Sequence, residues 1–109
     1  MNDRVTGLLG LARRAGKVAV GYDAALSAVR DGKGFIGLCA CDLSPKSRKE
    51  WLFSVSPTSV PIRTLPLTKD SLGAALGVHK PVGIITVCDE GFARAIGALC
   101  PESKEEETV

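Results

Sequence analysis

Two basic loops carry the side chains whose chemistry best suits a ligand. Arg13, Arg14 and Lys17 surround one turn, and Gly21–Asp23 then begins a helix. A helix N-terminus offers free backbone N–H groups and the positive end of the helix dipole, and both suit phosphate. His79–Pro81 forms a second small basic loop between a predicted helix and a predicted strand. Because both loops adjoin short elements of one predicted sheet, we expect them to share one rim of that sheet.

The sequence offers little for catalysis. It contains no G-x-x-x-x-G-K-[ST], no G-x-G-x-x-G and no G-x-S-x-G, so these nucleotide-binding and nucleophile motifs are absent. His79 is the single histidine, and a lone histidine in a loop is more often a surface residue than a general base. Asp42, Asp89 and Glu90 lie near expected strand ends, where α/β proteins bind ligands. Capping of the helix that follows explains Asp42 and Asp89 equally well. We therefore predict no enzymatic activity and no cofactor.

The four cysteines do not form a zinc pattern. Cys39 and Cys41 make the one close pair, and their C-x-C spacing places both side chains on one face of a strand. Zinc sites usually combine pairs of Cys or His ligands at wider, C-x-x-C-like spacing. We interpret Cys39, Cys41, Cys88 and Cys100 as small buried apolar side chains, because free cysteine is among the most buried residue types. A redox or metal role is the alternative, and we predict no bound metal.

Helical and strand periodicities alternate along the chain. Strand patterns cover Lys17–Val20, Phe35–Cys41, Val60–Leu65 and Val82–Cys88. The second and fourth of these runs are uncharged, which is typical of buried central strands, whereas Pro61 places the third at an edge. Helices are predicted to begin at Asn2 or Asp3, at Tyr22, at Ser44-Pro45, at Thr68 and at Asp89. Strands separated by helices predict an α/β fold, a three-layer α-β-α sandwich with a four-stranded mixed sheet.

Composition and charge fit one globular domain. The chain has 109 residues, of which 45% are hydrophobic and 24% are charged, and these ordinary values exclude a disordered or fibrous body. Residues 101–109 hold four glutamates and one lysine, so residues 1–100 carry 13 basic against 8 acidic side chains. We expect residues 1–100 to form the folded domain, the acidic tail 101–109 to be disordered, and the basic body to favour a polyanion partner. With no apolar run of membrane-spanning length and no signal peptide pattern, the expected location is the cytoplasm, without membrane contact.

Several ordered segments carry a resemblance to a known family. They are Leu8–Lys17, Gly21, Ala28-Val29 with Asp31-Gly32, Ala40, Asp42, Ser44, Val60-Pro61, Leu72–Pro81 and Asp89–Ala93. The most specific is Leu72–Pro81, which reads Leu-Gly-x-Ala-x-Gly-Val-His-Lys-Pro. In order and spacing, from about Val5 to Leu99, the chain resembles the kink-turn-binding ribosomal-protein superfamily (L7Ae and L30e types), and within it the short bacterial YlxQ-like proteins.

This resemblance implies an α-β-α RNA-binding domain without enzymatic activity. In the family, the turn before the second helix and the loop before the last strand grip a kinked RNA internal loop. The family reads sheared G·A pairs with Gly-x-Asn-Glu-x-x-Lys, of which this chain keeps Gly21 and replaces the other three positions by Asp23, Ala24 and Ser27. The absence of each direct contact to a base removes about 1–3 kcal/mol of discrimination. The second loop, Val78–Pro81, keeps the family's apolar–polar–proline pattern, which packs on splayed bases.

We therefore hypothesise that the chain is a monomeric, ribosome-associated binder of a kink-turn-like internal loop in ribosomal or other non-coding RNA. Ribosomal proteins are further candidate partners. The residues predicted to bind RNA are Arg14, Lys17, Gly21, Tyr22, Asp23, Lys33, Val78, His79, Lys80 and Pro81. One alternative is a protein–protein interaction module on the same fold that has lost kink-turn specificity. Another is a binder of a small acidic ligand, or an enzyme, that uses the helix N-termini and Asp42.

Overall fold

Helices and strands alternate along the chain in the predicted order. The computed structural model describes residues 3–100, so the predicted acidic tail and the candidate cap Asn2 lie outside the described residues. The elements are α1 (Asp3–Arg14), β1 (Val18–Val20), α2 (Tyr22–Arg30), β2 (Ile36–Cys39), α3 (Pro45–Val55), β3 (Ile62–Thr64), α4 (Lys69–Leu76), β4 (Ile84–Val87) and α5 (Glu90–Gly97). All predicted helices and strands are present, but each strand is shorter than the apolar run that predicted it, because the flanking residues turn away towards the helices.

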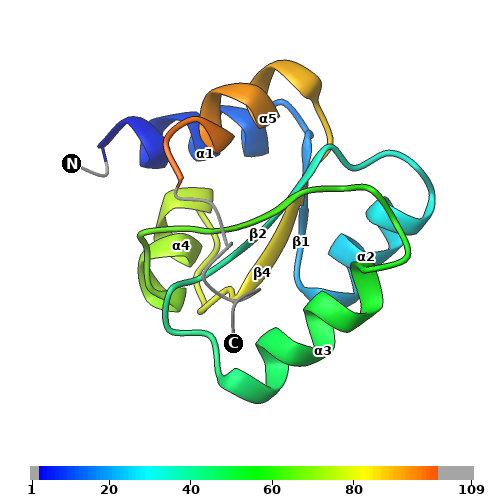
Figure 1. Ribbon diagram of the computed structural model, residues 1–109. Helices are drawn as coiled ribbons and strands as arrows, with labels where there is room; N and C mark the ends of the chain where they lie inside the picture. The colour runs from blue at the N-terminus through cyan, green and yellow to red at the C-terminus, as the bar shows by residue number, and fades with distance from the viewer. Residues whose placement is uncertain (1–2, 101–109) are drawn as a thin grey trace.

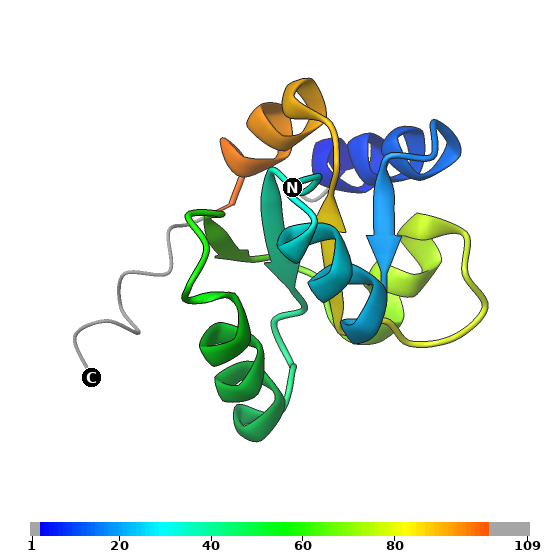
Figure 2. The ribbon, with the colours of Figure 1, turned by 90° about the vertical axis from the view of Figure 1, so that its right-hand side faces the viewer.

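The four strands form one mixed sheet in the order β1-β4-β2-β3. Val87 of β4 pairs antiparallel with Val18 of β1 on one side and with Ile36 of β2 on the other. Among the strands of residues 3–100, β2 and β3 make the single parallel pair. Figure 2 shows the consequence: β1 and β2 point one way and β4 points the other. The beginnings of β1 and β2 therefore lie beside the end of β4, and the ends of β1 and β2 lie beside its beginning.

Helices cover both faces of the sheet (Figure 1). One face packs on α1, α4 and α5 through a cluster that includes Leu9, Leu72, Ile85 and Ile96. The other face packs on α2 and α3 through a smaller cluster centred on Trp51, which is fully buried. The central strands β2 and β4 are buried along their whole length, and β3 lies at the edge as Pro61 predicts. The predicted three-layer α-β-α sandwich with a four-stranded mixed sheet is confirmed.

Polar caps begin three of the helices, as predicted. The side-chain oxygens of Ser44, Thr68 and Asp89 accept hydrogen bonds from the third amide of α3, α4 and α5, at 3.2, 3.1 and 2.9 Å. Such caps satisfy amides that have no partner within the helix. Asp42 differs from the prediction: its Oδ1 accepts from the Lys69 N–H at 2.8 Å, so it supports α4 and not the helix that follows it in sequence. Ser44 already caps that following helix.

The cysteine interpretation is partly wrong. Cys39 and Cys100 are buried, Cys88 is partly buried, and Cys41 is exposed. The reason is that β2 ends at Cys39, after which the Cys41 N–H donates to the Leu67 carbonyl and the chain turns towards α4. Within residues 3–100, no three Cys, His, Asp or Glu side chains gather as a metal-binding group. The helices of the same region are all too short or too polar to cross a membrane.

Candidate nucleic-acid interface

The loop Val78–Pro81, here called the strap loop, is fastened along α4. It begins where Gly77, at φ 77°, ends α4, and the Val78 N–H donates to the Gly73 carbonyl at 2.9 Å. It ends where the Val82 N–H donates to the Lys69 carbonyl at 3.0 Å. Both ends of the loop are thus hydrogen-bonded to the helix that it follows, and its backbone is fixed before any ligand arrives.

Gly73 allows this close approach. A Cβ atom at this position would overlap the backbone carbonyl of Lys80 in the strap loop. Because a backbone carbonyl cannot rotate away as the end of a long side chain can, a larger residue must displace the loop. This gives a physical reason for the Leu-Gly-x-Ala-x-Gly pattern noted in the sequence: Gly73 admits the strap loop, and Gly77 supplies the left-handed turn that starts it.

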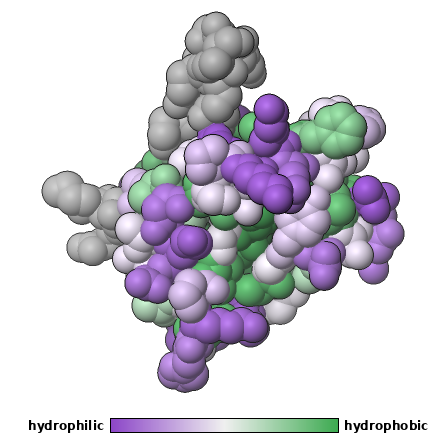
Figure 3. Space-filling model, turned by 90° about the horizontal axis from the view of Figure 1, so that it is seen from below, coloured by the Kyte–Doolittle hydropathy of each residue, from purple (hydrophilic) through white to green (hydrophobic). Residues whose placement is uncertain are grey.

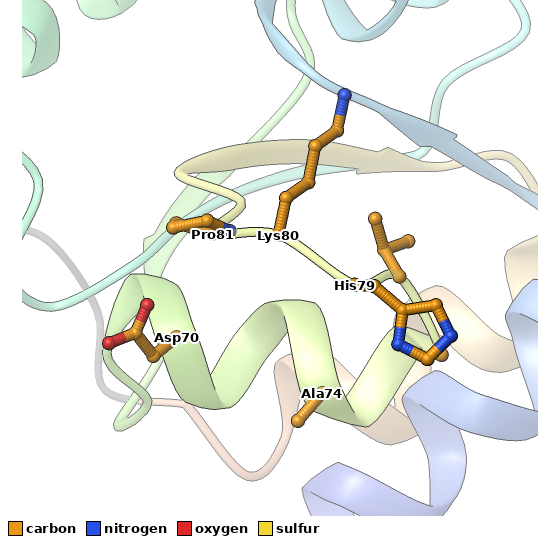
Figure 4. A pocket seen from close by; sticks show the side chains of 7 residues that line it. Asp70, Ala74, His79, Lys80 and Pro81 are labelled. Carbon is orange, nitrogen blue, oxygen red and sulfur yellow. The ribbon is translucent and has the colours of Figure 1, made fainter.

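The strap loop and α4 together border an open hollow of about 490 Å³. His79, Lys80 and Pro81 are exposed along it, whereas Val78 is partly buried and packs against the main core. Figure 4 shows the Lys80 side chain directed away from α4, while Asp70 and Ala74 lie on the helix. The Lys80 ammonium group can therefore reach a ligand. Most of the apolar surface of Val78 is buried against the main core.

A second hollow, of about 510 Å³, connects the strap loop with the start of α2. Gly21 lies at φ 96° and its N–H donates to the Ile84 carbonyl at 2.9 Å, which ties the start of α2 to the beginning of β4. Among the described residues no side chain caps α2, so its first amides and the positive end of its dipole are available to an anion. Lining residues include Gly21, Tyr22, Lys80 and Pro81. The predicted association of these two loops at one rim is therefore present.

Apolar residues form the floor of this second hollow and hydrophilic ones surround it. Val20, Leu43, Val82 and Ile84 contribute to its lining. Figure 3 views this end of the molecule and shows apolar residues gathered at its middle with hydrophilic residues around them. An apolar floor with a polar border suits an unstacked base better than it suits a free ion.

Tyr22 has a structural role that the sequence did not indicate. Its ring meets the Trp51 ring edge-on, with centroids 5.9 Å apart, and its hydroxyl lies 2.8 Å from the Ser54 hydroxyl. The side chain thereby joins α2 to α3 across the second core. Because both the ring and the hydroxyl are engaged, the partly buried Tyr22 side chain offers only part of its surface to the hollow.

The groove end of the sheet, defined by the residues lining the two hollows, is not strongly basic. Its charged lining residues within the described chain are two lysines and two carboxylates, with His79 beside them: Lys69, Lys80, Glu50 and Asp70. Asp23 is exposed in the first turn of α2, next to the free amides. Shape and free backbone groups therefore distinguish this end of the sheet more than net charge does.

The other predicted site residues lie elsewhere. Arg14 borders a third hollow with Gly77, beside the start of the strap loop. Lys17 and Lys33 flank Cys88 at the opposite end of the sheet, where β1 and β2 begin and β4 ends. The expectation that both loops share one rim therefore holds for the start of α2 but not for Lys17, because the three-residue β1 separates Lys17 from Gly21.

Sequence reasoning also missed residues at the groove end. Lys69 and Leu43 line the second hollow, and neither was predicted to contact a ligand. The signal for Lys69 was its place directly after the cap Thr68, at a helix start near the strap loop. Leu43 carried no signal, because only the turn after β2 brings it to the hollow.

Comparison with known proteins identifies the fold and the family. Residues 3–97 match the ribosomal protein L7Ae/L30e/S12e/Gadd45 family. The chain belongs to this family. Among its relatives, the RNA-binding protein YlxQ of Bacillus subtilis is 30% identical over 92 residues, covering 84% of this chain and 90% of that protein. The large ribosomal subunit protein eL30 of Dictyostelium discoideum is 29% identical over 91 residues, covering 84% and 81%.

Two solved structures share the fold of this chain. A protein of unknown function from Bacillus halodurans has a TM-score of 0.80 at 30% identity, covering 88% of this chain and 95% of that one. The Giardia lamblia 15.5kD RNA binding protein has a TM-score of 0.74 at 18% identity, covering 90% and 82%, and supports the fold. Because the named sequence relatives are ribosomal or RNA-binding proteins, membership of this family also supports the prediction that the chain is not an enzyme.

Proposed function

We propose that the chain binds structured RNA without catalysis, gripping a kink-turn-like internal loop of ribosomal or other non-coding RNA in the cytoplasm. The observation that carries the proposal is the groove end itself. There the fixed strap loop and the uncapped start of α2 face one apolar-floored hollow. The name of the YlxQ relative, an RNA-binding protein, gives the class of ligand.

Each part of the groove end has a role in this proposal. The first amides of α2 bind phosphate, since among the described residues no side chain caps them. Lys80 and Lys69 add phosphate contacts from the two sides of the hollow. An unstacked base packs on the apolar floor against Pro81. Ala24 and Ser27 stand where the family reads bases, so discrimination comes from the shape of the internal loop.

A titration of the chain with two RNAs tests the proposal. One RNA carries a kink-turn, and the other is a duplex of matched length without the internal loop. Measured at about 50 and about 200 mM salt, both affinities fall with salt because phosphate contacts release counterions. We expect loop-dependent binding at both salt concentrations, and Lys80→Ala to weaken binding of the kink-turn RNA alone. Equal affinity for the two RNAs would overturn the proposal.

The balanced charge at the groove end favours one other candidate, a protein–protein interaction module on the same fold. Asp23 is exposed beside the amides that would meet phosphate, and the lining carries equal numbers of lysines and carboxylates. Ribosomal proteins are the natural partners to test. This candidate predicts that such a partner stays bound after nuclease treatment, and loss of every partner on that treatment would exclude it.

A further inference from the structure

The end of the sheet opposite the groove end, here called the basic end, presents an exposed aromatic side chain beside exposed lysines. It is formed by the turns α1–β1, α2–β2 and β4–α5, at the upper ends of the strands in Figure 2. Lys17 and Lys33 are exposed there, and Phe35 is 44% exposed. Phe53 of α3 is more exposed, at 79%, so exposure alone does not distinguish Phe35. What distinguishes Phe35 is its place beside exposed lysines at the ends of the strands.

Strand register places three of these side chains in a row. Val87 pairs with both Val18 and Ile36, so Lys17, Cys88 and Phe35, each one position further out, are neighbours across the three strands. The Cys88 N–H donates to the Lys17 carbonyl at 2.7 Å, and the Phe35 N–H donates to the Val87 carbonyl at 2.8 Å. Since side chains alternate along a strand, all three face the α2 side of the sheet.

Lys33 lies near this row, in a tightly packed turn between α2 and β2. Its N–H donates to the Ala28 carbonyl at 3.0 Å. A Cβ at the next residue, Gly34, would lie 2.5 Å from the Cγ2 of Thr86, so the turn rests directly on β4. The charges of both Lys33 and Lys17 act to lower the pKa of the Cys88 thiol, which agrees with both cations lying near it.

Helix stability does not explain these two lysines. Basic residues in the last turn of a helix interact favourably with its dipole, and this accounts for Arg13 in α1 and Arg30 in α2. Lys17 and Lys33 lie outside both helices, in the turns that follow them. Their positions are therefore not explained by interaction with a helix dipole.

Few carboxylates at the basic end compete for the two lysines. In the turn β4–α5, Asp89 caps α5, and Glu90 pairs with Arg94 at 2.9 Å. Asp31, exposed at the end of α2, is the acidic residue of the turn α2–β2. The three turns hold Lys17 and Lys33 against Asp31 and Asp89, and the last turns of α1 and α2 add the exposed Arg13 and Arg30. Cations therefore outnumber carboxylates at this end, and the balance favours an anionic ligand.

We propose that the basic end is a second RNA-binding surface, which takes a single-stranded segment by stacking a base on Phe35 and holding its phosphates between Lys17 and Lys33. Stacking on an aromatic ring beside cations is the usual way in which single strands are held without sequence reading. A duplex keeps its bases stacked internally and leaves Phe35 unused, which is why the single strand is the better fit. The proposal takes the class of ligand from the proposed function, but it uses residues at the other end of the sheet.

The test uses the full chain and an unstructured, fluorescently labelled RNA of about 12 nucleotides, within the site sizes of single-strand binders. Lys17→Glu/Lys33→Glu is compared with Arg4→Glu/Lys49→Glu, which makes the same change in net charge at positions on α1 and α3. We expect the first pair to lose about tenfold or more in affinity and the control to lose much less. Phe35→Ala, with no change in charge, is expected to lose about fivefold or more.

The outcomes separate this proposal from the proposed function. Binding of the short RNA that falls with the Lys17/Lys33 and Phe35 variants supports the second surface, whether or not a kink-turn RNA binds. A ternary complex of chain, kink-turn RNA and labelled short RNA supports both. Equal loss in the charge-matched control, or no binding of the short RNA at low salt, overturns the second surface even if Lys80→Ala weakens kink-turn binding as expected. Should the double reversal reduce folding, Lys17→Ala/Lys33→Ala replaces it, with circular dichroism as the check.

Discussion

The two ends of the sheet differ in how they are built. At the groove end the backbone is fixed: the strap loop is hydrogen-bonded to α4 at both of its ends, and Gly21 is tied to β4. Its lining charges balance. At the basic end the surface is a row of strand-end side chains, with exposed lysines and a partly exposed phenylalanine. The four residues of β4 keep the two ends about 13 Å apart or more.

In our proposals, this difference divides recognition between two surfaces of one small domain. Shape and backbone groups carry information about RNA structure, whereas cations supply affinity that is largely independent of sequence. In our proposals these two properties lie at opposite ends of the chain, because the family's lysine position in α2 is Ser27, whereas Lys17 and Lys33 are exposed in the turns at the far end. Substitutions at one end should therefore change selectivity, and substitutions at the other should change the salt dependence.

The largest effect is expected from Gly73→Val. The added side chain overlaps the Lys80 carbonyl, so the strap loop must move away from α4. We expect a loss of about 1–3 kcal/mol in the free energy of unfolding, as for other overpacked sites. The affinity for kink-turn RNA should fall by more than the loss of folded protein explains. The affinity for the short single strand should persist. Urea denaturation and RNA titration under the same conditions measure both quantities.

Gly7→Ala is the matched control for this variant. Gly7 also lies in a helix, but a Cβ there meets nothing within 4 Å. Alanine in a helix is favoured over glycine by about 0.5–1 kcal/mol, so this variant should gain stability and bind both RNAs as before. If Gly73→Val behaved like Gly7→Ala, the strap loop would not depend on Gly73.

The second prediction compares two variants, each of which removes the lysines of one end. Lys69→Ala/Lys80→Ala should reduce the preference for the kink-turn RNA over the loop-free duplex. For the short single strand, Lys17→Ala/Lys33→Ala should reduce the slope of log affinity against log salt by about 0.7 for each phosphate that no longer meets a cation, and should leave the kink-turn preference intact. Titrations at several salt concentrations give both values. The same change in both variants would mean that the two ends act as one diffuse basic surface.

Much of the fold could be predicted from the sequence because its signals are local. Uncharged apolar runs predicted the buried strands β2 and β4, and the cap residues Ser44, Thr68 and Asp89 predicted three helix starts. Asp42 shows the limit of such signals. Its side chain caps α4, a helix that begins 27 residues later, and only the tertiary fold brings the Lys69 amide to it. The burial predicted for Cys41 was wrong for a related reason: β2 ends at Cys39, and the Cys41 N–H donates to the distant Leu67 carbonyl.

The candidate site was predicted in part. The strap loop and the start of α2 do meet, because β1 ends where β4 begins. The sequence could not show that Lys17 and Lys33 lie at the other end, since that depends on strand order and direction. It also could not show that Gly73 positions the strap loop, because Gly73 meets a backbone carbonyl and this leaves no side-chain pattern.

The third prediction concerns Tyr22, which the sequence placed in the RNA site. Tyr22→Phe removes the hydroxyl bonded to Ser54 and keeps the ring against Trp51. We expect a loss of about 0.5–1.5 kcal/mol in unfolding free energy, as for one net hydrogen bond. RNA affinity should be unchanged, because the hydroxyl already faces α3. A loss of kink-turn binding in the fully folded variant would show instead that this hydroxyl contacts RNA.

The smallest expected effect is on thiol reactivity, which reports on the two ends separately. Burial raises the pKa of the Cys88 thiol, and a backbone hydrogen bond from Ala19 and the charges of Lys33 and Lys17 oppose this only in part. Since the thiolate is the reactive form, Cys88 should be alkylated by iodoacetamide more slowly than the exposed Cys41 near pH 8. The difference between the two alkylation rates should become smaller as the pH rises and the Cys88 thiol ionises.

Bound RNA should then act on these two thiols differently. A short single strand at the basic end should slow alkylation of Cys88 and leave Cys41 unchanged, because Cys41 follows β2 at the groove end. Peptide mass spectrometry after timed labelling measures each rate, with Lys17→Glu/Lys33→Glu as the variant in which protection of Cys88 is lost. Protection of Cys41 by the short strand, with Cys88 unaffected, would place single-strand binding at the groove end and remove the distinction between the two ends.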